Sequence, residues 1–260
     1  MKYQKFLLYL RLELNQNLFY KNYFILRLYS TNFFNLLHDT LKFNTINLIM
    51  SISDNIARLF STPVFKSPEK YKFNKSELNF IDKQREKAII NQSGNLFSKN
   101  SYVLESPELK NLKEFCNNNL FMYFYDGFNV KKDIEIYITQ SWINFNQKNT
   151  SHHRHKHINS IISSVLFIKG EMCPITFHNS QRNLFGNLMS YEDFAAPNEN
   201  NAAQFNFNNE NGKLFLFPST LLHSVAKNKS DVERISLSFN TFIKGQLGGA
   251  QNSLQALNIK

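Results

Sequence analysis

Residues 212–242 read GKLFLFPSTLLHSVAKNKSDVERISLSFNTF, and this stretch decides which fold we expect. It holds three runs with β-branched or aromatic residues, separated by a turn at Pro218 and by a polar segment, and such runs are typical of β-strands. Three further runs lie upstream, at 134–145, 160–168 and 174–179. Many short strands without helices between them predict a sandwich or barrel.

The residues before this β-rich region predict helices. Within 74–91, Leu78, Ile81 and residues 88–90 stand among charged residues, which predicts an amphipathic helix capped by Ser76. A second helix is expected to begin where a serine precedes a proline. Both helices are assigned to support the outside of a sheet, because apolar stripes form cores far more often than ligand sites. The start and the expected buried stripe of the second helix are Ser106, Pro107, Leu109, Leu112, Phe115 and Cys116.

Four segments are expected along the chain: an atypical extension at 1–49, a helical support region at 50–133, the β core at 134–245 and a tail at 246–260. The extension is apolar and Asn-rich but has no sustained period, and it has no compact apolar core with a small-residue cleavage site. The sequence after Met50 looks like a natural protein start. The extension is therefore either an over-extended gene model or an extra N-terminal helix pair.

Composition limits the class of protein. The 260 residues are 42% hydrophobic with only 8 Gly and 6 Pro, which indicates a globular fold. The net charge is +10, but 1–49 hold six Lys or Arg against two acidic residues and the rest is spread thinly, so a solvated basic surface is favoured over nucleic-acid binding. Every apolar stretch is too short for a membrane helix. Cys116 and Cys173 show no pairing pattern, which favours a reducing, cytoplasmic setting.

Histidines are concentrated in SHHRHKHINS, residues 151–160, where four of them fall within six positions. Residues at i and i+2 on an extended strand point the same way, so His155 and His157 can direct both imidazoles to one ion. A surface tract that binds metal adventitiously is the alternative interpretation.

His223 and Arg234 stand at the starts of the last two expected strands. Arg234 shares a strand face with the serines at its i+2 and i+4 positions, and an arginine on an inward face is costly unless it meets an anion. A surface salt bridge with Asp231 or Glu233 is the alternative. Between these strands and the histidine tract, residues 181–211 are polar and are expected to form a loop or lid.

Together these features resemble the iron(II)/2-oxoglutarate oxygenase superfamily, and more closely the oxygenases of marine bacteria and their phages. The resemblance extends from Ile134 to Gly245 and implies a mainly β (α+β) fold, a double-stranded β-helix of the jelly-roll or cupin-like kind, with N-terminal helices supporting it. The segments that carry the resemblance are YITQSWIN (137–144), HKHINS (155–160), SSVLFI (163–168), FPSTLLHSV (217–225) and RISLSFN (234–240), with LFSTPVF (59–65) and SKNSYVLES (98–106) matching less specifically.

The resemblance implies an enzyme that uses Fe(II), 2-oxoglutarate and O2 to hydroxylate a substrate through a ferryl intermediate. His155 and His223 would be imidazole ligands of the metal, and Arg234 would pair with the distal carboxylate of 2-oxoglutarate. Tyr137 and Asn144 are further candidates for hydrogen bonds to the co-substrate. The sequence leaves the primary substrate and the oligomeric state open.

The chain departs from the superfamily at one ligand. The usual second ligand is Asp or Glu two positions after the first histidine, and here that position is His157. Either the centre has three histidine ligands (His155, His157 and His223), or a carboxylate elsewhere completes it, or the metal binds more weakly.

Two other functions are compatible with the sequence. A cupin-like metal-binding protein or dioxygenase that does not use 2-oxoglutarate would explain GKLFLFPSTLLH and three histidines, but it gives Arg234 no role. A binding or structural module with a degenerate site would retain no metal. A serine hydrolase is poorly supported, because GxSxG is missing.

Overall fold

The structure is a computed structural model that describes residues 59, 61–91, 94–171, 174–179, 195–208, 210–248 and 256–260. The chain divides into two compact units, Met1–Leu59 and Phe60–Lys260, and nearly all described residues belong to the second. The extension expected at 1–49 therefore lies outside the described residues, as do Cys173 and residues 181–194 of the expected lid. Among the described residues, no helix is long and apolar enough to span a membrane.

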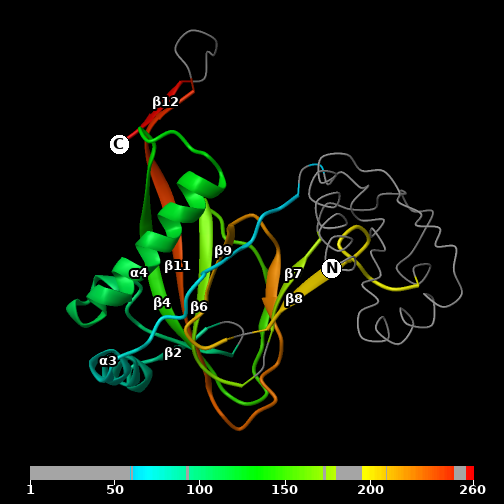
Figure 1. Ribbon diagram of the computed structural model, residues 1–260. Coiled ribbons are helices and arrows are strands. Elements are labelled where there is room, and N and C mark those ends of the chain that lie inside the picture. The colour runs from blue at the N-terminus through cyan, green and yellow to red at the C-terminus, as the bar shows by residue number, and fades with distance from the viewer. Residues whose placement is uncertain are drawn as a thin grey trace, which may run out of the picture. The chain divides into compact units, whose positions relative to one another are not determined.

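Two antiparallel sheets form the second unit (Figure 1). The large sheet has the order β1-β9-β6-β11-β4-β3-β2, with β12 paired to β11, and the small sheet has the order β5-β10-β7-β8. The strands of the large sheet are β1 (Phe65–Lys66), β2 (Ile89–Ile90), β3 (Leu96–Phe97), β4 (Glu135–Asn146), β6 (Ile162–Lys169), β9 (Leu214–Pro218), β11 (Arg234–Leu247) and β12 (Leu257–Ile259). Those of the small sheet are β5 (His152–His155), β7 (Ile175–His178), β8 (Gln204–Phe207) and β10 (His223–Val225).

The eight strands from β4 to β11 pass back and forth between the two sheets. Strands β4, β6, β9 and β11 lie in the large sheet, and β5, β7, β8 and β10 lie in the small one. Eight antiparallel strands shared in this way between two facing sheets make a jelly roll, the architecture of the double-stranded β-helix. The predicted fold is confirmed, and all six strand runs expected from the sequence are present.

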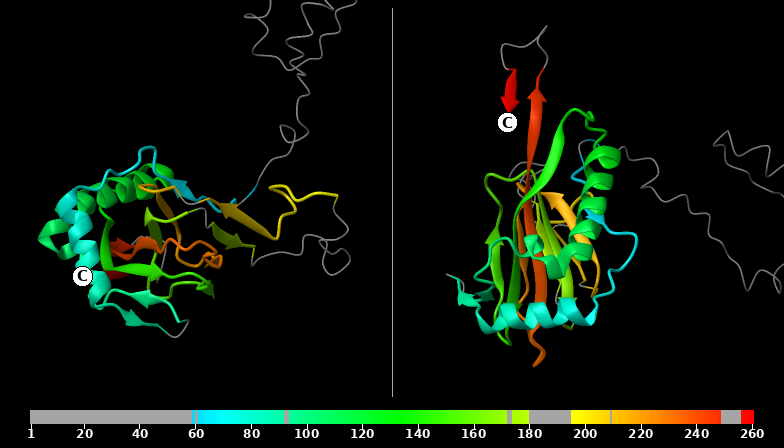
Figure 2. Two further views of the ribbon diagram at one scale, coloured as in Figure 1. Left: turned by 90° about the horizontal axis from the view of Figure 1, so that it is seen from below. Right: turned by 90° about the vertical axis from the view of Figure 1, so that its left-hand side faces the viewer.

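Helices cover the face of the large sheet that is turned away from the small sheet (Figure 2). They are α3 (Lys75–Glu86) and α4 (Lys110–Phe121), with the short 3-10 turns η3 (Val103–Glu105) and η4 (Pro107–Leu109) and the π-helical turn η5 (Met122–Gly127). Leu109, Leu112 and Cys116 are fully buried in the same core as Ile143 and Leu237 of the large sheet. The predicted stripe of the second helix and its supporting role are therefore confirmed.

The first helix differs from its prediction at both ends. Its cap is Asn74 instead of Ser76, because Asn74 has an extended backbone and its side chain accepts a hydrogen bond from the Glu77 amide while the Glu77 carboxylate accepts one from the Asn74 amide. The helix ends at Glu86, and Ile89–Ile90 form β2, as suits β-branched residues. Leu78, expected on the buried stripe, is 41% exposed.

The expected loop at 181–211 is interrupted by β8, which pairs with β7 at the edge of the small sheet. Two phenylalanines in this polar stretch explain the strand: Phe207 packs on the core between the sheets, and Phe205 lies opposite Phe177 in the register. The prediction of a continuous loop was wrong for these four residues.

Candidate metal centre and anion pocket

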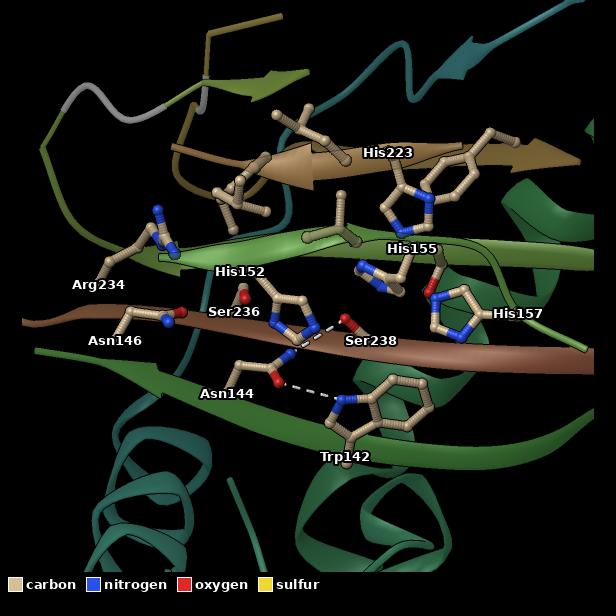
Figure 3. Close-up of a pocket in the computed structure, with 16 residues that line it drawn as sticks. Trp142, Asn144, Asn146, His152, His155, His157, His223, Arg234, Ser236 and Ser238 are labelled. Carbon is tan, nitrogen blue, oxygen red and sulfur yellow. Dashed lines mark hydrogen bonds between the residues drawn. The ribbon is translucent and has the colours of Figure 1, made fainter. Parts of the chain in front are cut away.

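A cavity of about 130 Å³ lies between the two sheets, beside the core formed by β6, β7 and β9. Strands β4 and β11 line it with asparagine and serine side chains, and β5 and β10 line it with histidines (Figure 3). The described residues that line it include no Asp or Glu. Apolar side chains of β6, β7 and β9 complete its wall, and the described lining residues carry no negative charge.

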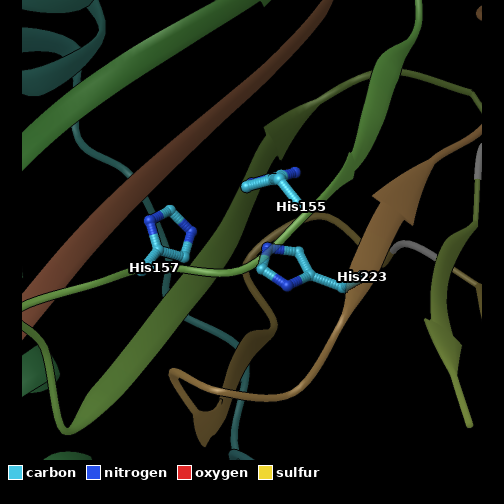
Figure 4. A group of neighbouring side chains, drawn as sticks. All are labelled: His155, His157 and His223. Atoms are coloured by element: carbon cyan, nitrogen blue, oxygen red, sulfur yellow. The ribbon is translucent and has the colours of Figure 1, made fainter. Parts of the chain in front are cut away.

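Three histidines converge at one end of the cavity (Figure 4). His155 ends β5 and is the register partner of His223, which begins β10, while His157 lies two residues beyond β5. One ring nitrogen from each lies within 4.8 Å of the other two. The structure thus brings together all three residues predicted as ligands, although His157 reaches the group from outside the strand on which the prediction placed it.

Backbone carbonyls orient two of these rings. The Nδ1 atom of His155 is 2.8 Å from the His153 carbonyl oxygen, and Nδ1 of His223 is 2.9 Å from the Leu221 carbonyl oxygen. A carbonyl only accepts, so in both rings Nδ1 carries the proton and Nε2 keeps its lone pair. A lone pair on Nε2 is what a metal ion requires.

The charge state of the rings also suits metal binding. Burial, with the neighbouring imidazoles adding to it, lowers the pKa of His157 to about 4 and that of His223 to about 3. Burial likewise lowers the pKa of His155. All three imidazoles are therefore neutral at pH 7, the form in which histidine coordinates metals.

Arg234 lines the other end of the cavity and is only 1% exposed. It begins β11 opposite Asn146 of β4, and its Nη1 donates a hydrogen bond to the Ala226 carbonyl oxygen at 3.3 Å. Gly170 lies directly against it: a Cβ atom built there would be 3.0 Å from Arg234 Cγ. The aliphatic part of the Arg234 side chain therefore packs against the backbone of Gly170, where a larger residue would not fit.

The structure excludes the surface salt bridge that the sequence left open for Arg234. Asp231 pairs with Lys148 at 2.7 Å, and Glu233 pairs with Arg85 at 2.8 Å. Arg234 and its two following serines, Ser236 and Ser238, all line the cavity, as the alternation predicted.

The two candidates for further co-substrate contacts lie in different places. Asn144 lines the cavity, where it accepts a hydrogen bond from Trp142 Nε1 at 3.1 Å and donates one to Ser238 Oγ at 3.2 Å. Tyr137 does not line it; Lys244 Nζ lies 4.8 Å from the centre of its ring. Seven residues of strand, roughly 20 Å, separate the two.

His152 is a fourth cavity histidine, which sequence reasoning did not select. Figure 3 shows its ring between Arg234 and the three converging histidines, and its ring centre is 4.4 Å from that of His155. Residues three apart on a regular strand face opposite sides, but the pairing of β5 with β10 is irregular between His223 and Val225, which gives β5 one extra residue. Nothing in the sequence marks this bulge.

Comparisons with known proteins give one family. Residues 140–240, from within β4 to within β11, match the family described as "Putative 2OG-Fe(II) oxygenase". No curated protein matches the chain. The sequence prediction of an iron(II)- and 2-oxoglutarate-dependent oxygenase is confirmed by this family match.

Solved structures similar to the chain carry related descriptions. An oxidoreductase of the 2OG-Fe(II) oxygenase family from Burkholderia pseudomallei is 15% identical, with a TM-score of 0.46, 68% of this chain and 83% of that chain covered. HygX from Streptomyces hygroscopicus, with nickel, 2-oxoglutarate and hygromycin B bound, is 11% identical, with a TM-score of 0.45 and coverages of 69% and 82%. A prolyl-4-hydroxylase from Pseudomonas putida is 11% identical, with a TM-score of 0.44 and coverages of 69% and 93%.

Proposed function

We propose that this protein is an oxygenase that hydroxylates its substrate at an iron(II) centre held by His155, His157 and His223, with 2-oxoglutarate bound between that centre and Arg234. The observation that carries the proposal is that one cavity holds a converging histidine triad at one end and a buried arginine at the other. The family match over the same strands supports it.

The donor set fits iron. Neutral imidazole is a ligand for Fe(II), and three protein ligands leave positions open for a co-substrate and O2. When bound, the metal supplies the activation of O2, coupled to the decarboxylation of 2-oxoglutarate. The chain supplies orientation: two carbonyl oxygens fix the proton on Nδ1 of His155 and His223.

The co-substrate fits the charge of the cavity. 2-Oxoglutarate is a dianion, and the described lining residues carry an arginine and no carboxylate. A planar guanidinium can bind a carboxylate through two parallel hydrogen bonds, and the bond is strengthened where water is excluded. Asn144 and Ser238 place further polar atoms along the same wall.

Two narrower proposals follow from the sequence. We propose that the chain belongs to the marine bacterial and phage-type group of these oxygenases, and the HKHINS and RISLSFN segments support this proposal. A cytoplasmic location suits Cys116, a free thiol that is fully buried.

The test is to load the full-length protein with Fe(II) without oxygen, add 2-oxoglutarate, and record the visible charge-transfer band of a chelated 2-oxo acid. We expect the band in the wild type. It should be lost in His223→Ala because iron no longer binds, and in Arg234→Met because the co-substrate is not held.

Two controls match these variants. His178→Ala removes a buried histidine of β7 that bonds Ser224 and does not line the cavity. Arg85→Met removes an arginine that pairs with Glu233 outside the cavity. Both should keep the band. Iron binding without any band would favour the cupin-like protein, and no iron binding would contradict the proposal.

A further inference from the structure

Asn240 of β11 is the polar side chain next to the third histidine. Its side-chain nitrogen Nδ2 lies 3.5 Å from His157 Nδ1, and its oxygen Oδ1 lies 2.8 Å from Ser163 Oγ. The two ends of an Asn amide have the same shape, so exchanging Oδ1 and Nδ2 changes the hydrogen bonds without moving other atoms. Which end faces His157 decides where that ring carries its proton.

A chain of serine hydroxyls leads away from Asn240. Ser163 Oγ is 2.7 Å from Ser219 Oγ, and Ser219 Oγ is 2.7 Å from Ser160 Oγ. Ser160 Oγ is 3.2 Å from the Ile162 carbonyl oxygen, where this row of hydroxyls ends. Ser163 and Ser219 are each 1% exposed. Four contacts therefore connect the Asn240 side chain to a backbone oxygen.

Counting hydrogens decides the orientation of the amide. Three hydroxyls supply three hydrogens, and a backbone oxygen supplies none. With Oδ1 facing Ser163, both ends of the chain are acceptors, so one of the four contacts has no hydrogen in it. With the amide NH2 facing Ser163, each of the four contacts has a hydrogen. The second orientation therefore makes one more hydrogen bond in this chain, which stabilises it by about 0.5–1.5 kcal/mol.

The same rotation settles the protonation of His157. It turns Oδ1 of Asn240 toward Nδ1 of His157, so that Nδ1–H donates and the Nε2 lone pair is left for a metal. With Nδ2 of Asn240 facing His157, the ring proton would instead be on Nε2. His155 and His223 already have Nδ1 protonated through backbone carbonyls, so the rotated amide gives all three rings the same tautomer.

We propose that Asn240 is a positioning residue whose side-chain oxygen accepts the Nδ1–H of His157 and holds that imidazole ready to coordinate through Nε2. The inference rests on the proposed metal centre, and it concerns the position where other oxygenases of the superfamily have a carboxylate. The acceptor for His157 Nδ1–H is a side chain and not a backbone carbonyl. A mutation of Asn240 can therefore change the tautomer of His157.

The first test needs no metal. In the metal-free, full-length protein labelled with 15N-histidine, the chemical shifts of the ring nitrogens report which one is protonated, with His157→Gln identifying the signals. We expect the His157 ring proton on Nδ1. Protonation at Nε2 would overturn the inference whatever the metal does.

The second test measures Co(II) affinity by calorimetry. Asn240→Leu should weaken binding by about 10–100-fold, the usual effect of losing a group that orients a ligand, whereas Asn240→Asp should stay within a few-fold because its carboxylate accepts the same hydrogen. Thr241→Val is the matched control: the Thr241 hydroxyl bonds Ile162 backbone in the same layer, so its loss should leave the affinity unchanged.

The outcomes separate the two proposals. A wild type that binds no Co(II) would contradict the metal centre, while the tautomer measurement still decides the role of Asn240. Unchanged or tighter binding by a folded Asn240→Leu, with His157→Ala losing affinity, would overturn the role of Asn240 and leave the metal centre standing.

Discussion

The two sheets contribute to the site in different ways. The large sheet supplies Arg234 and Asn144 from β11 and β4, which pair over eleven register positions and pack against helices on one face. The small sheet supplies His155 and His223 from strands of four and three residues that share only two register positions. Arg234 therefore stands on a long, well-packed pairing, whereas two of the proposed metal ligands stand on a short, irregular pairing that a bound ion would strengthen.

The largest expected difference between the two sheets is in stability, and one alanine substitution in each sheet tests it. Leu237→Ala empties a fully buried position of β11 and should reduce the free energy of unfolding by about 2–5 kcal/mol. His155→Ala, on a half-buried position of β5, should change it by less than about 1 kcal/mol in the metal-free protein. Urea unfolding followed by circular dichroism measures both. Similar losses in the two variants would show that the sheets are equally important for stability.

Gly170→Ala tests the packing behind Arg234. Its φ of +139° and a Cβ position 3.0 Å from Arg234 Cγ predict both backbone strain of about 1–3 kcal/mol and displacement of the guanidinium, seen as a raised KM for 2-oxoglutarate. Gly94→Ala is the control, because its φ is +78° with nothing within 4 Å of the added atom. It should lose stability without a change in KM. An equal KM effect in both would contradict the packing argument.

Acid should weaken the metal-free protein through the histidines of the small sheet. Burial, with the neighbouring imidazoles adding to it, lowers the pKa of His152 and that of His223 to about 3. Between pH 6.5 and about 3 the unfolded chain therefore binds protons that the folded chain does not. Stability therefore falls as the pH falls through this window. Urea unfolding at pH 7.5 and 5.5 measures the loss, which should be smaller in His152→Ala. A loss that is the same in both proteins would assign it to other groups.

The smallest expected effect is that of His152→Ala on the KM for 2-oxoglutarate. Its ring lies between Arg234 and the histidine triad, so removing it should raise the KM for 2-oxoglutarate several-fold while leaving Fe(II) affinity unchanged. Steady-state kinetics and a metal titration of His152→Ala check the two parts. A fall in Fe(II) affinity would instead make His152 part of the metal end of the cavity.

The sequence predicted the parts of the site that follow from strand alternation. Arg234 and its serines lie on one inward face because β11 is regular over that stretch, and His223 opens β10 as its apolar context indicated. His152 was missed because a bulge places it inside the cavity. Tyr137 was included because the resemblance marked its strand, and the sequence does not show which part of β4 lines the cavity. The Asn74 cap and β8 were missed because local hydrogen bonds and two phenylalanines outweighed the surrounding pattern.

The most direct test of the central claim is a crystal structure of the full-length protein grown without oxygen with Fe(II) and 2-oxoglutarate, with anomalous data collected at the iron edge. We predict one iron peak among His155, His157 and His223, with the co-substrate extending from it to the Arg234 guanidinium. Iron bound only to the exposed His153, or 2-oxoglutarate bound away from Arg234, would contradict the account.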